Sequence, residues 1–228
     1  IFSAVISLIE DFQPNMMFSQ QRTILHMAVV LESPTLFDIV LNIPGINVNA
    51  LDNEKRSPLH LACNCGYSLR ATELVNRGAV ITALDSHDNT PLHCACRGNS
   101  HQTFEYLMSV PESKYILLHC NKDKDTCLHL AAFYGNVYLV KAVLSHNLDT
   151  KTLNANGFSA LECACSSIHG SVDMAKFLVK QGCNPVRRNE IDGSTTLHLA
   201  SRHGHIGLTI WLVKKYADIV ELGFPHNT

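Results

Sequence analysis

Three Cys-x-Cys pairs are the first residues in this sequence whose types and spacing could do chemistry. They are Cys63/Cys65, Cys94/Cys96 and Cys163/Cys165, and thiolates are favoured ligands of zinc. Within each pair, however, a single residue separates the cysteines, whereas zinc knuckles place about two to four residues between theirs. We therefore expect no metal site and interpret these cysteines as small, buried apolar side chains.

Histidines are the second group that could support catalysis, and the sequence has 13 of them. Five follow a Thr or Ser by three residues in the pattern Thr-x-Leu-His, namely His26, His60, His93, His129 and His198. A histidine that recurs at one place in a repeated pattern is better explained by structure than by catalysis. We expect each of these five to hydrogen-bond locally and to tie neighbouring segments together.

Sequence motifs of the common enzyme classes are missing. The 228 residues contain no phosphate-binding glycine loop, dinucleotide fingerprint, nucleophile elbow or His-Glu-x-x-His motif. No catalytic or cofactor-binding residue can be named on this basis. We expect a protein that is not an enzyme and needs no cofactor.

The Thr-x-Leu-His motif recurs along the whole chain. Its copies begin at Thr23, Ser57, Thr90, Thr126, Ser159 and Thr195, which are 34, 33, 36, 33 and 36 residues apart. The fifth copy has Glu162 in place of histidine. A period near 33 residues with a Thr-Pro-Leu-His-x-Ala core resembles the ankyrin-repeat family. This resemblance implies an all-α solenoid of six helix-turn-helix repeats with β-hairpin fingers between them.

The repeat period also predicts the organisation of the chain. An apolar stripe at helical spacing predicts an N-terminal capping helix in residues 1–17, and residues 223–228 are expected to be an unstructured tail. The six repeats are expected at 18–51, 52–84, 85–120, 121–153, 154–189 and 190–222. The third and fifth repeats carry extra residues around 110–114 and 166–170, which we expect to lengthen loops and leave the core intact.

Charge and cysteine content argue against several classes of function. With 18 Lys and Arg against 20 Asp and Glu, the chain has no basic surplus for gripping nucleic acid or an anionic membrane. No apolar run is long enough to span a bilayer. Nine cysteines without a disulfide-framework spacing favour the reducing cytoplasm or nucleus. We expect an intracellular monomer with a protein partner, and, because the sequence begins at Ile1, a segment of a longer protein.

In an ankyrin array the finger tips and the exposed ends of the first helices form one extended recognition surface. The adjacent Phe133 and Tyr134, with Arg97 before them and Arg202 and His203 after them, have the composition of an interface hot spot. Two plainer interpretations stay open. Phe133 could pack into the next repeat, and the charged finger tips could simply be solvated.

Among ankyrin proteins, the chain resembles the inhibitor-of-kappaB (IκB) family. The resemblance lies in residues 90–96, an extended segment carrying His119, and residues 126–131, together with the count of six repeats. It implies regulation of transcription by binding a Rel/NF-κB dimer, with the first repeats on its basic nuclear-localisation tail and the later repeats against its immunoglobulin-like domains. The acidic residues that would meet the tail are Asp52, Glu54, Asp85 and Asp88.

Several alternatives remain within and beyond this resemblance. The 228 residues contain neither the Asp-Ser-Gly-x-x-Ser degron nor the acidic tail of the classical inhibitors, so inhibitor and co-activator, and cytoplasm and nucleus, all stay open. The competing hypothesis is a scaffold or adaptor segment of an unrelated ankyrin protein, such as a channel, a ligase adaptor or a kinase-linked array. A regulatory module attached to an enzyme is a third possibility.

Overall fold

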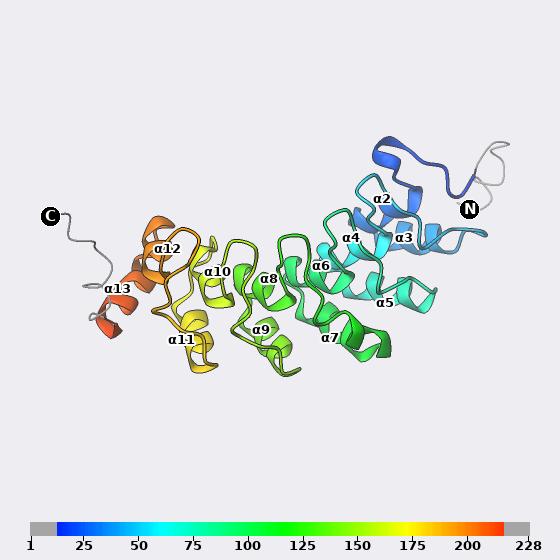
Figure 1. Cartoon of the computed structure of the whole chain (residues 1–228). Coiled ribbons are helices and arrows are strands. Elements are labelled where there is room, and N and C mark those ends of the chain that lie inside the picture. Colours follow the sequence, from blue (N-terminus) through cyan, green and yellow to red (C-terminus); the bar gives the residue numbers. More distant parts are fainter. Residues whose placement is uncertain (1–12, 217–228) are drawn as a thin grey trace. The chain divides into compact units, whose positions relative to one another are not determined.

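Figure 1 shows the computed structural model of the chain, in which residues 13–216 are described. Within this range there are twelve α-helices, two short 3₁₀-helices and no strand, so the expected all-α class is confirmed. The fingers expected as β-hairpins are tight turns instead. The expected capping helix, apart from residues 13–17, and the expected tail at 223–228 lie outside the described residues.

Residues up to Lys122 belong to one compact unit, which contains three pairs of α-helices. The bounds are α2 Ile24–Val30, α3 Pro34–Leu41, α4 Pro58–Asn64, α5 Ser68–Asn76, α6 Pro91–Arg97 and α7 His101–Ser109. The first helices of the pairs pack on one another, α2 on α4 and α4 on α6, and α5 packs on α7. This is the stacked helix-pair arrangement of a solenoid.

Two 3₁₀-helices flank these pairs, η1 (Ser19–Gln21) before α2 and η2 (Pro111–Tyr115) after α7. The second one occupies the insertion that we expected to be a loop. Its Ser113 is fully buried, and the Oγ of that serine donates a hydrogen bond of 2.5 Å to the Leu107 carbonyl. The extra residues of the third repeat are therefore ordered against α7.

Residues from Asp123 onward form a second unit, which again contains three helix pairs. The bounds are α8 Cys127–Phe133, α9 Val137–Leu144, α10 Ala160–Ser166, α11 Val172–Lys180, α12 Thr196–Arg202 and α13 Ile206–Lys215. Here α10 packs between α8 and α12, and α11 packs on α13. No helix in residues 13–216 is long and apolar enough to cross a membrane.

Every first helix begins directly after the Thr or Ser of the repeated motif. In α4 the Oγ of Ser57 accepts a hydrogen bond from the His60 amide, and Pro58 occupies the first turn, where its missing amide would have had no partner. The leucine two residues after the cap has no exposed surface in five of the six repeats, at Leu25, Leu59, Leu92, Leu128 and Leu161. The repeated motif thus encodes both the start of the helix and its buried face.

Candidate partner-binding surface

Three of the repeated histidines, His26, His60 and His129, link their first helix to the finger that follows it, as expected from the sequence. In α4, Nδ1 of His60 accepts a hydrogen bond of 3.1 Å from the Ser57 amide, and Nε2 lies 3.2 Å from the Asn89 carbonyl of the next finger. His26 reaches the Arg56 carbonyl at 3.0 Å in the same way, and His129 reaches the Phe158 carbonyl at 3.1 Å. Because Nδ1 is the acceptor, the proton of the neutral ring resides on Nε2 and is donated to the finger.

Burial holds these rings in the neutral form. Desolvation by burial lowers the pKa of His26, His60 and His129, and the hydrogen bonds to finger carbonyls and the nearby carboxylates only partly offset it. A second proton would also remove the Nδ1 acceptor from the helix cap. These histidines are therefore structural, because their ring nitrogens form hydrogen bonds within the protein.

We expect acidification to destabilise the protein through these three rings. Because their pKa is lower in the folded state, the unfolded chain binds more protons as the pH falls below about 6.5. Three such groups predict a free energy of unfolding that falls between pH 7 and pH 6, by at most about 2 kcal/mol. Urea unfolding at a series of pH values measures this slope.

A His60→Gln variant is the matched control, because glutamine keeps an acceptor and a donor but does not titrate. Its slope should be about one third smaller than that of the parent chain. If the pH dependence of the free energy of unfolding were the same in this variant, His60 would not contribute to it, and the prediction would be contradicted. Asp52 and Asp85 affect the free energy of unfolding only at lower pH, because their pKa values lie below the ordinary value of 3.8.

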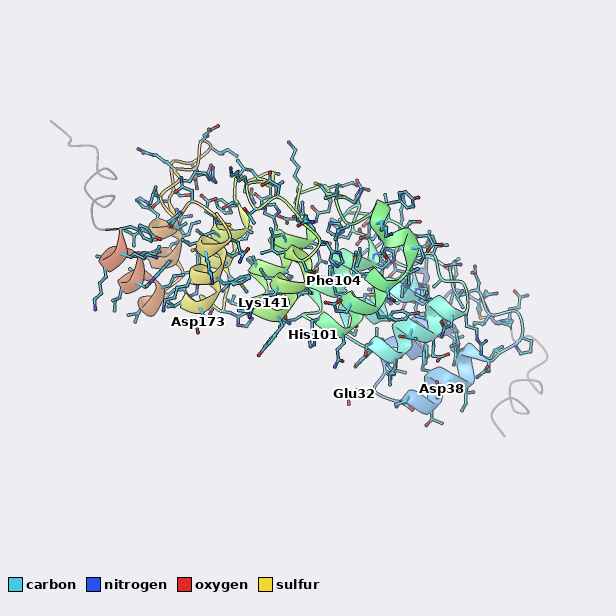
Figure 2. All side chains as sticks on the ribbon, turned by 90° about the horizontal axis from the view of Figure 1, so that it is seen from below. Glu32, Asp38, His101, Phe104, Lys141 and Asp173 are labelled. Carbon is cyan, nitrogen blue, oxygen red and sulfur yellow. The ribbon has the colours of Figure 1, made fainter. Side chains whose placement is uncertain are left out.

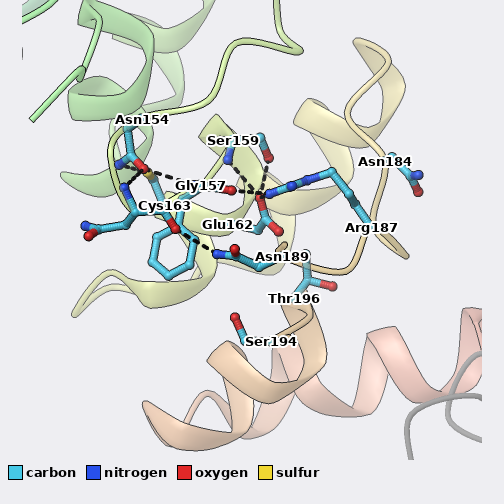
Figure 3. Close-up of polar contacts among 12 residues, drawn as sticks. Asn154, Gly157, Ser159, Glu162, Cys163, Asn184, Arg187, Asn189, Ser194 and Thr196 are labelled. Atoms are coloured by element: carbon cyan, nitrogen blue, oxygen red, sulfur yellow. Dashed lines mark hydrogen bonds and ion pairs between the residues drawn. The ribbon is translucent and has the colours of Figure 1, made fainter. Parts of the chain in front are cut away.

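The fifth repeat replaces this histidine link with an ion pair, shown in Figure 3. Oε2 of Glu162 accepts hydrogen bonds from the Ser159 amide at 2.7 Å and the Ser159 hydroxyl at 3.0 Å, as the histidine Nδ1 does elsewhere. The guanidinium of Arg187 pairs with the same carboxylate and donates to the Gly157 carbonyl. The link to the following segment is kept, but the arginine of that segment reaches back instead of a histidine reaching forward.

Of the four acidic finger residues expected to meet a partner, Asp52 and Asp85 are buried within their own turns. The Asp52 side chain has no exposed surface, accepts hydrogen bonds from the amides of Glu54 and Arg56, and lies 2.8 Å from the Arg56 guanidinium. Asp85 accepts from the Asn89 amide and side chain at 2.8 and 3.0 Å. Their carboxylates close the fingers, and Asp85 also lines the hollow that contains Arg97. Contact of Asp52 and Asp85 with a partner stays a prediction.

The other two acidic residues lie nearer the surface. Glu54 is exposed and pairs with Arg56 at 2.9 Å. Asp88 is half-buried at the tip of its finger, in the left-handed conformation that Lys55 and Lys124 adopt at the equivalent tips. Its carbonyl lies 3.0 Å from Nε2 of His119, which ties the extended segment after α7 to this finger.

A small hollow brings one predicted basic residue together with the fingers. Arg97, exposed at the end of α6, lines a space of about 100 Å³ with Glu54, Arg56, His87 and Asn64. The hollow lies between the first-helix ends and the finger tips, where the sequence predicted the recognition surface. It is lined by both acidic and basic groups.

The aromatic pair lies at the end of α8. Phe133 and Tyr134 are both half-buried and meet edge to face, with ring centroids 5.3 Å apart and planes at 83°. Neither ring is a fully buried core residue. In the same unit Arg202 and His203 are exposed at the end of α12, where the His203 ring stacks on His205 at 6.1 Å.

A second hollow, of about 670 Å³, lies on the opposite helices of the first unit. It is lined by Phe37 and Pro34 of α3, by Tyr67 and Leu69 at the start of α5, and by the exposed carboxylates Glu32, Asp38 and Glu73; Figure 2 labels Glu32 and Asp38 at this edge. Beneath it the buried Arg70 donates to the Val29 and Leu31 carbonyls. Sequence analysis did not identify this hollow.

The cysteines at the small-residue position are packing residues. Cys63, Cys96 and Cys165 have no exposed surface, and burial raises the pKa of the Cys165 thiol to about 12. All nine cysteines are free. No group of three or more His, Cys, Asp or Glu side chains within residues 13–216 is arranged to hold a metal ion.

Comparison with known proteins decides the family. The profile for three consecutive ankyrin repeats matches residues 25–117 and 113–189, and the single-repeat profile matches residues 192–222. The chain belongs to the ankyrin-repeat family. This confirms the expectation drawn from the repeat period.

Individual ankyrin proteins resemble the chain more distantly. The mouse serine/threonine-protein kinase TNNI3K is 36% identical over 97 residues, which cover 42% of this chain and 12% of the kinase. Human NF-kappa-B inhibitor alpha is 28% identical over 122 residues, covering 51% and 38% respectively. The chain thus spans less than half of either relative.

Among solved structures, the ankyrin repeat domain of Bcl-3, described as a unique member of the IkappaB protein family, is similar over most of the chain. It superposes with a TM-score of 0.65 at 28% sequence identity, covering 87% of this chain and 88% of that domain. The recognised resemblance to the IκB family is therefore confirmed in both sequence and structure.

Sequence analysis missed the ion pairs of two arginines. Arg56 was not singled out, although it neutralises both Asp52 and Glu54. Arg187 was not paired with Glu162, although a glutamate in place of the repeated histidine signals that a cation must replace the histidine donor.

Proposed function

We propose that this ankyrin array binds a Rel/NF-κB-type dimer and regulates transcription through it. The observation that carries the proposal is the similarity to the Bcl-3 ankyrin domain over 87% of the chain, with NF-kappa-B inhibitor alpha as a second IκB relative. The proposed role is that of an interaction module without catalytic activity.

Each unit contributes its own set of candidate contact residues. In the first unit, Glu54 and Asp88 are the acidic finger residues that remain available to a basic tail, with Arg97 beside Glu54 in the same hollow. In the second unit, Phe133 and Tyr134 provide the apolar contact and Arg202 and His203 the polar rim. Aromatic residues with arginine at their edge are enriched at interface hot spots.

A titration tests the proposal directly. The chain is mixed with a Rel-homology dimer, with and without the nuclear-localisation tail, at about 150 mM salt. We expect a dissociation constant in the nanomolar range that weakens when the tail is removed. Absence of binding to either dimer would overturn the proposal.

Replacing Phe133 and Tyr134 together with alanine should weaken this binding by more than about 2 kcal/mol, or roughly 30-fold, with the helical circular dichroism unchanged. Tyr138→Ala is the matched control, because that ring is 73% exposed on α9 and lies outside the proposed surface. A loss of helical signal in the double variant would instead show that the two rings belong to the core.

The second candidate function is that of a scaffold segment in a larger signalling protein. It is favoured by the match to the TNNI3K kinase, which has the higher identity but covers only 97 residues. The same titration separates the two, since a scaffold for another partner has no affinity for the Rel-homology dimer.

A further inference from the structure

The hollow of about 670 Å³ on α3 and α5 lies where the second repeat departs from the pattern of the others. Directly before the second helix, four other repeats have a Ser or Asn whose side chain caps that helix, namely Ser33, Ser100, Asn136 and Ser171. The second repeat has Tyr67 there, and its side chain forms no capping bond. Three residues later Arg70 is buried, at the position where α7, α9 and α11 bury Thr103, Leu139 and Met174. Two positions that serve the fold in other repeats thus line a hollow in this one.

Arg70 is held in place by the end of α2. Its Nη1 donates hydrogen bonds to the carbonyls of Val29 at 2.5 Å and Leu31 at 2.6 Å, which the end of that helix leaves without an intrahelical donor. Its guanidinium carbon also lies 4.4 Å from the centre of the Tyr67 ring and 5.6 Å from the centre of the Phe37 ring. Contacts of this kind between a cation and an aromatic face are attractive. Arg70 therefore holds both rings beside the hollow that all three residues line.

Apolar side chains from both helices line the hollow. Pro34 and Phe37 belong to α3, and Tyr67 and Leu69 lie at the start of α5. Leu69 is 81% exposed, so its apolar surface is available to a partner. Ligand sites in proteins typically have mostly apolar linings and volumes of about 300–1,000 Å³. The hollow therefore has both the room and the lining to take an apolar side chain.

Three exposed carboxylates surround this apolar lining, those of Glu32, Asp38 and Glu73. Figure 2 shows Glu32 and Asp38 at one edge of the first unit. No Lys or Arg side chain in residues 13–216 forms an ion pair with any of the three. The buried carboxylate of Asp52, in contrast, is neutralised by Arg56. The rim of the hollow therefore carries negative charge that a cationic partner would neutralise.

We infer that the hollow on α3 and α5 is a docking site for a short segment of a protein partner in which a Leu or Phe is flanked by Arg or Lys. The apolar side chain enters the hollow between Phe37, Tyr67 and Leu69, and the flanking cations pair with the carboxylates of the rim. Because α3 and α5 are the second helices of their pairs, this site is separate from the surface formed by finger tips and first-helix ends. The partner is therefore a different protein from the Rel/NF-κB-type dimer, and the inference stands independently of that dimer.

An array of short synthetic peptides tests the inference on the full chain. Each peptide has a central Leu, Phe or Ser, flanked on both sides by Arg, Gln or Glu. We expect peptides with Arg around Leu or Phe to bind with dissociation constants in the micromolar range, and either a central Ser or flanking Gln to weaken binding by at least about tenfold. The bound peptide should shift the backbone NMR signals of α3 and α5 and leave those of the finger tips unchanged. Shifts confined to the finger tips, or no binding by any peptide, would overturn the inference.

Two matched variants separate the rim from the general charge of the chain. Glu32→Gln/Asp38→Asn/Glu73→Gln removes the rim carboxylates and should weaken peptide binding by about tenfold, because each exposed ion pair contributes little and three act together.

The control variant neutralises three exposed carboxylates outside the hollow, as Glu105→Gln/Glu112→Gln/Glu190→Gln, and should weaken binding by less than about twofold. An equal loss in both variants would show only general attraction and would overturn the inference. Displacement of the peptide by a Rel-homology dimer would also overturn it, as would concentration-dependent dimers of the chain that protect the α3 and α5 amides from exchange.

Discussion

Replacing Arg187 with alanine should lower the free energy of unfolding by about 3 kcal/mol. The Glu162 side chain is only 1% exposed, so the variant leaves a carboxylate inside the protein without its cation. Removing one partner of a buried pair costs about 3–5 kcal/mol for this reason. We take the lower end because the Arg187 side chain is 23% exposed. Urea unfolding followed by circular dichroism measures the loss.

The repeated histidine provides the matched control for this prediction. In a Glu162→His/Arg187→Ala double variant, the fifth repeat regains the residue that the other repeats use, and no charge is left buried. We expect this double variant to recover at least half of the stability that Arg187→Ala loses. A loss below about 1 kcal/mol in the single variant, the size expected of an exposed ion pair, would show that water already screens the carboxylate.

Replacing Leu128 with alanine should cost about 2–5 kcal/mol. Leu128 has no exposed surface and lies on α8, which packs on both α9 and α10, so the shorter side chain leaves a cavity between three helices. Because repeats couple mainly to their neighbours, the loss of amide protection should be greatest in α8 to α11. Hydrogen exchange read residue by residue measures this distribution.

Leu118→Ala is the same substitution at a leucine that is 72% exposed. It should change stability by less than about 0.5 kcal/mol. Unchanged protection in α8 to α11 of the Leu128 variant would refute the nearest-neighbour account of this unit.

Most of the fold could be predicted because local chemistry repeats with a fixed period. The capping Thr or Ser, the buried leucine and the small residue recur in one order, so each repeat starts its first helix in the same way and buries the same face of it. The histidine links could also be predicted, since they too recur. Glu162 and Arg187 could not be paired in advance, because their contact depends on how one finger approaches the preceding helix.

The finger carboxylates are an example of site residues whose surroundings could not be predicted from the sequence. A charge run such as residues 52–56 is read by default as a solvated, partner-facing tip. In the structure Asp52 turns inward, because hydrogen bonds from the amides of its own turn and the Arg56 guanidinium outweigh the cost of burying the carboxylate. These contacts hold the pKa of the Asp52 carboxyl below its ordinary value, although burial alone would raise it. Side-chain direction within a five-residue turn is a three-dimensional property that residue type alone does not determine.

The distribution of thiols has a consequence for how the protein meets oxidants and thiol reagents. Only Cys65 and Cys120 are exposed among nine free cysteines, and burial raises the pKa of Cys63, Cys163 and Cys183, so these react only when the helices separate. Several repeats thus have thiols in their stacking interfaces that do not react while the repeat is folded. The rate at which a reagent modifies each buried thiol therefore reports how often its own repeat opens, and no added label is needed.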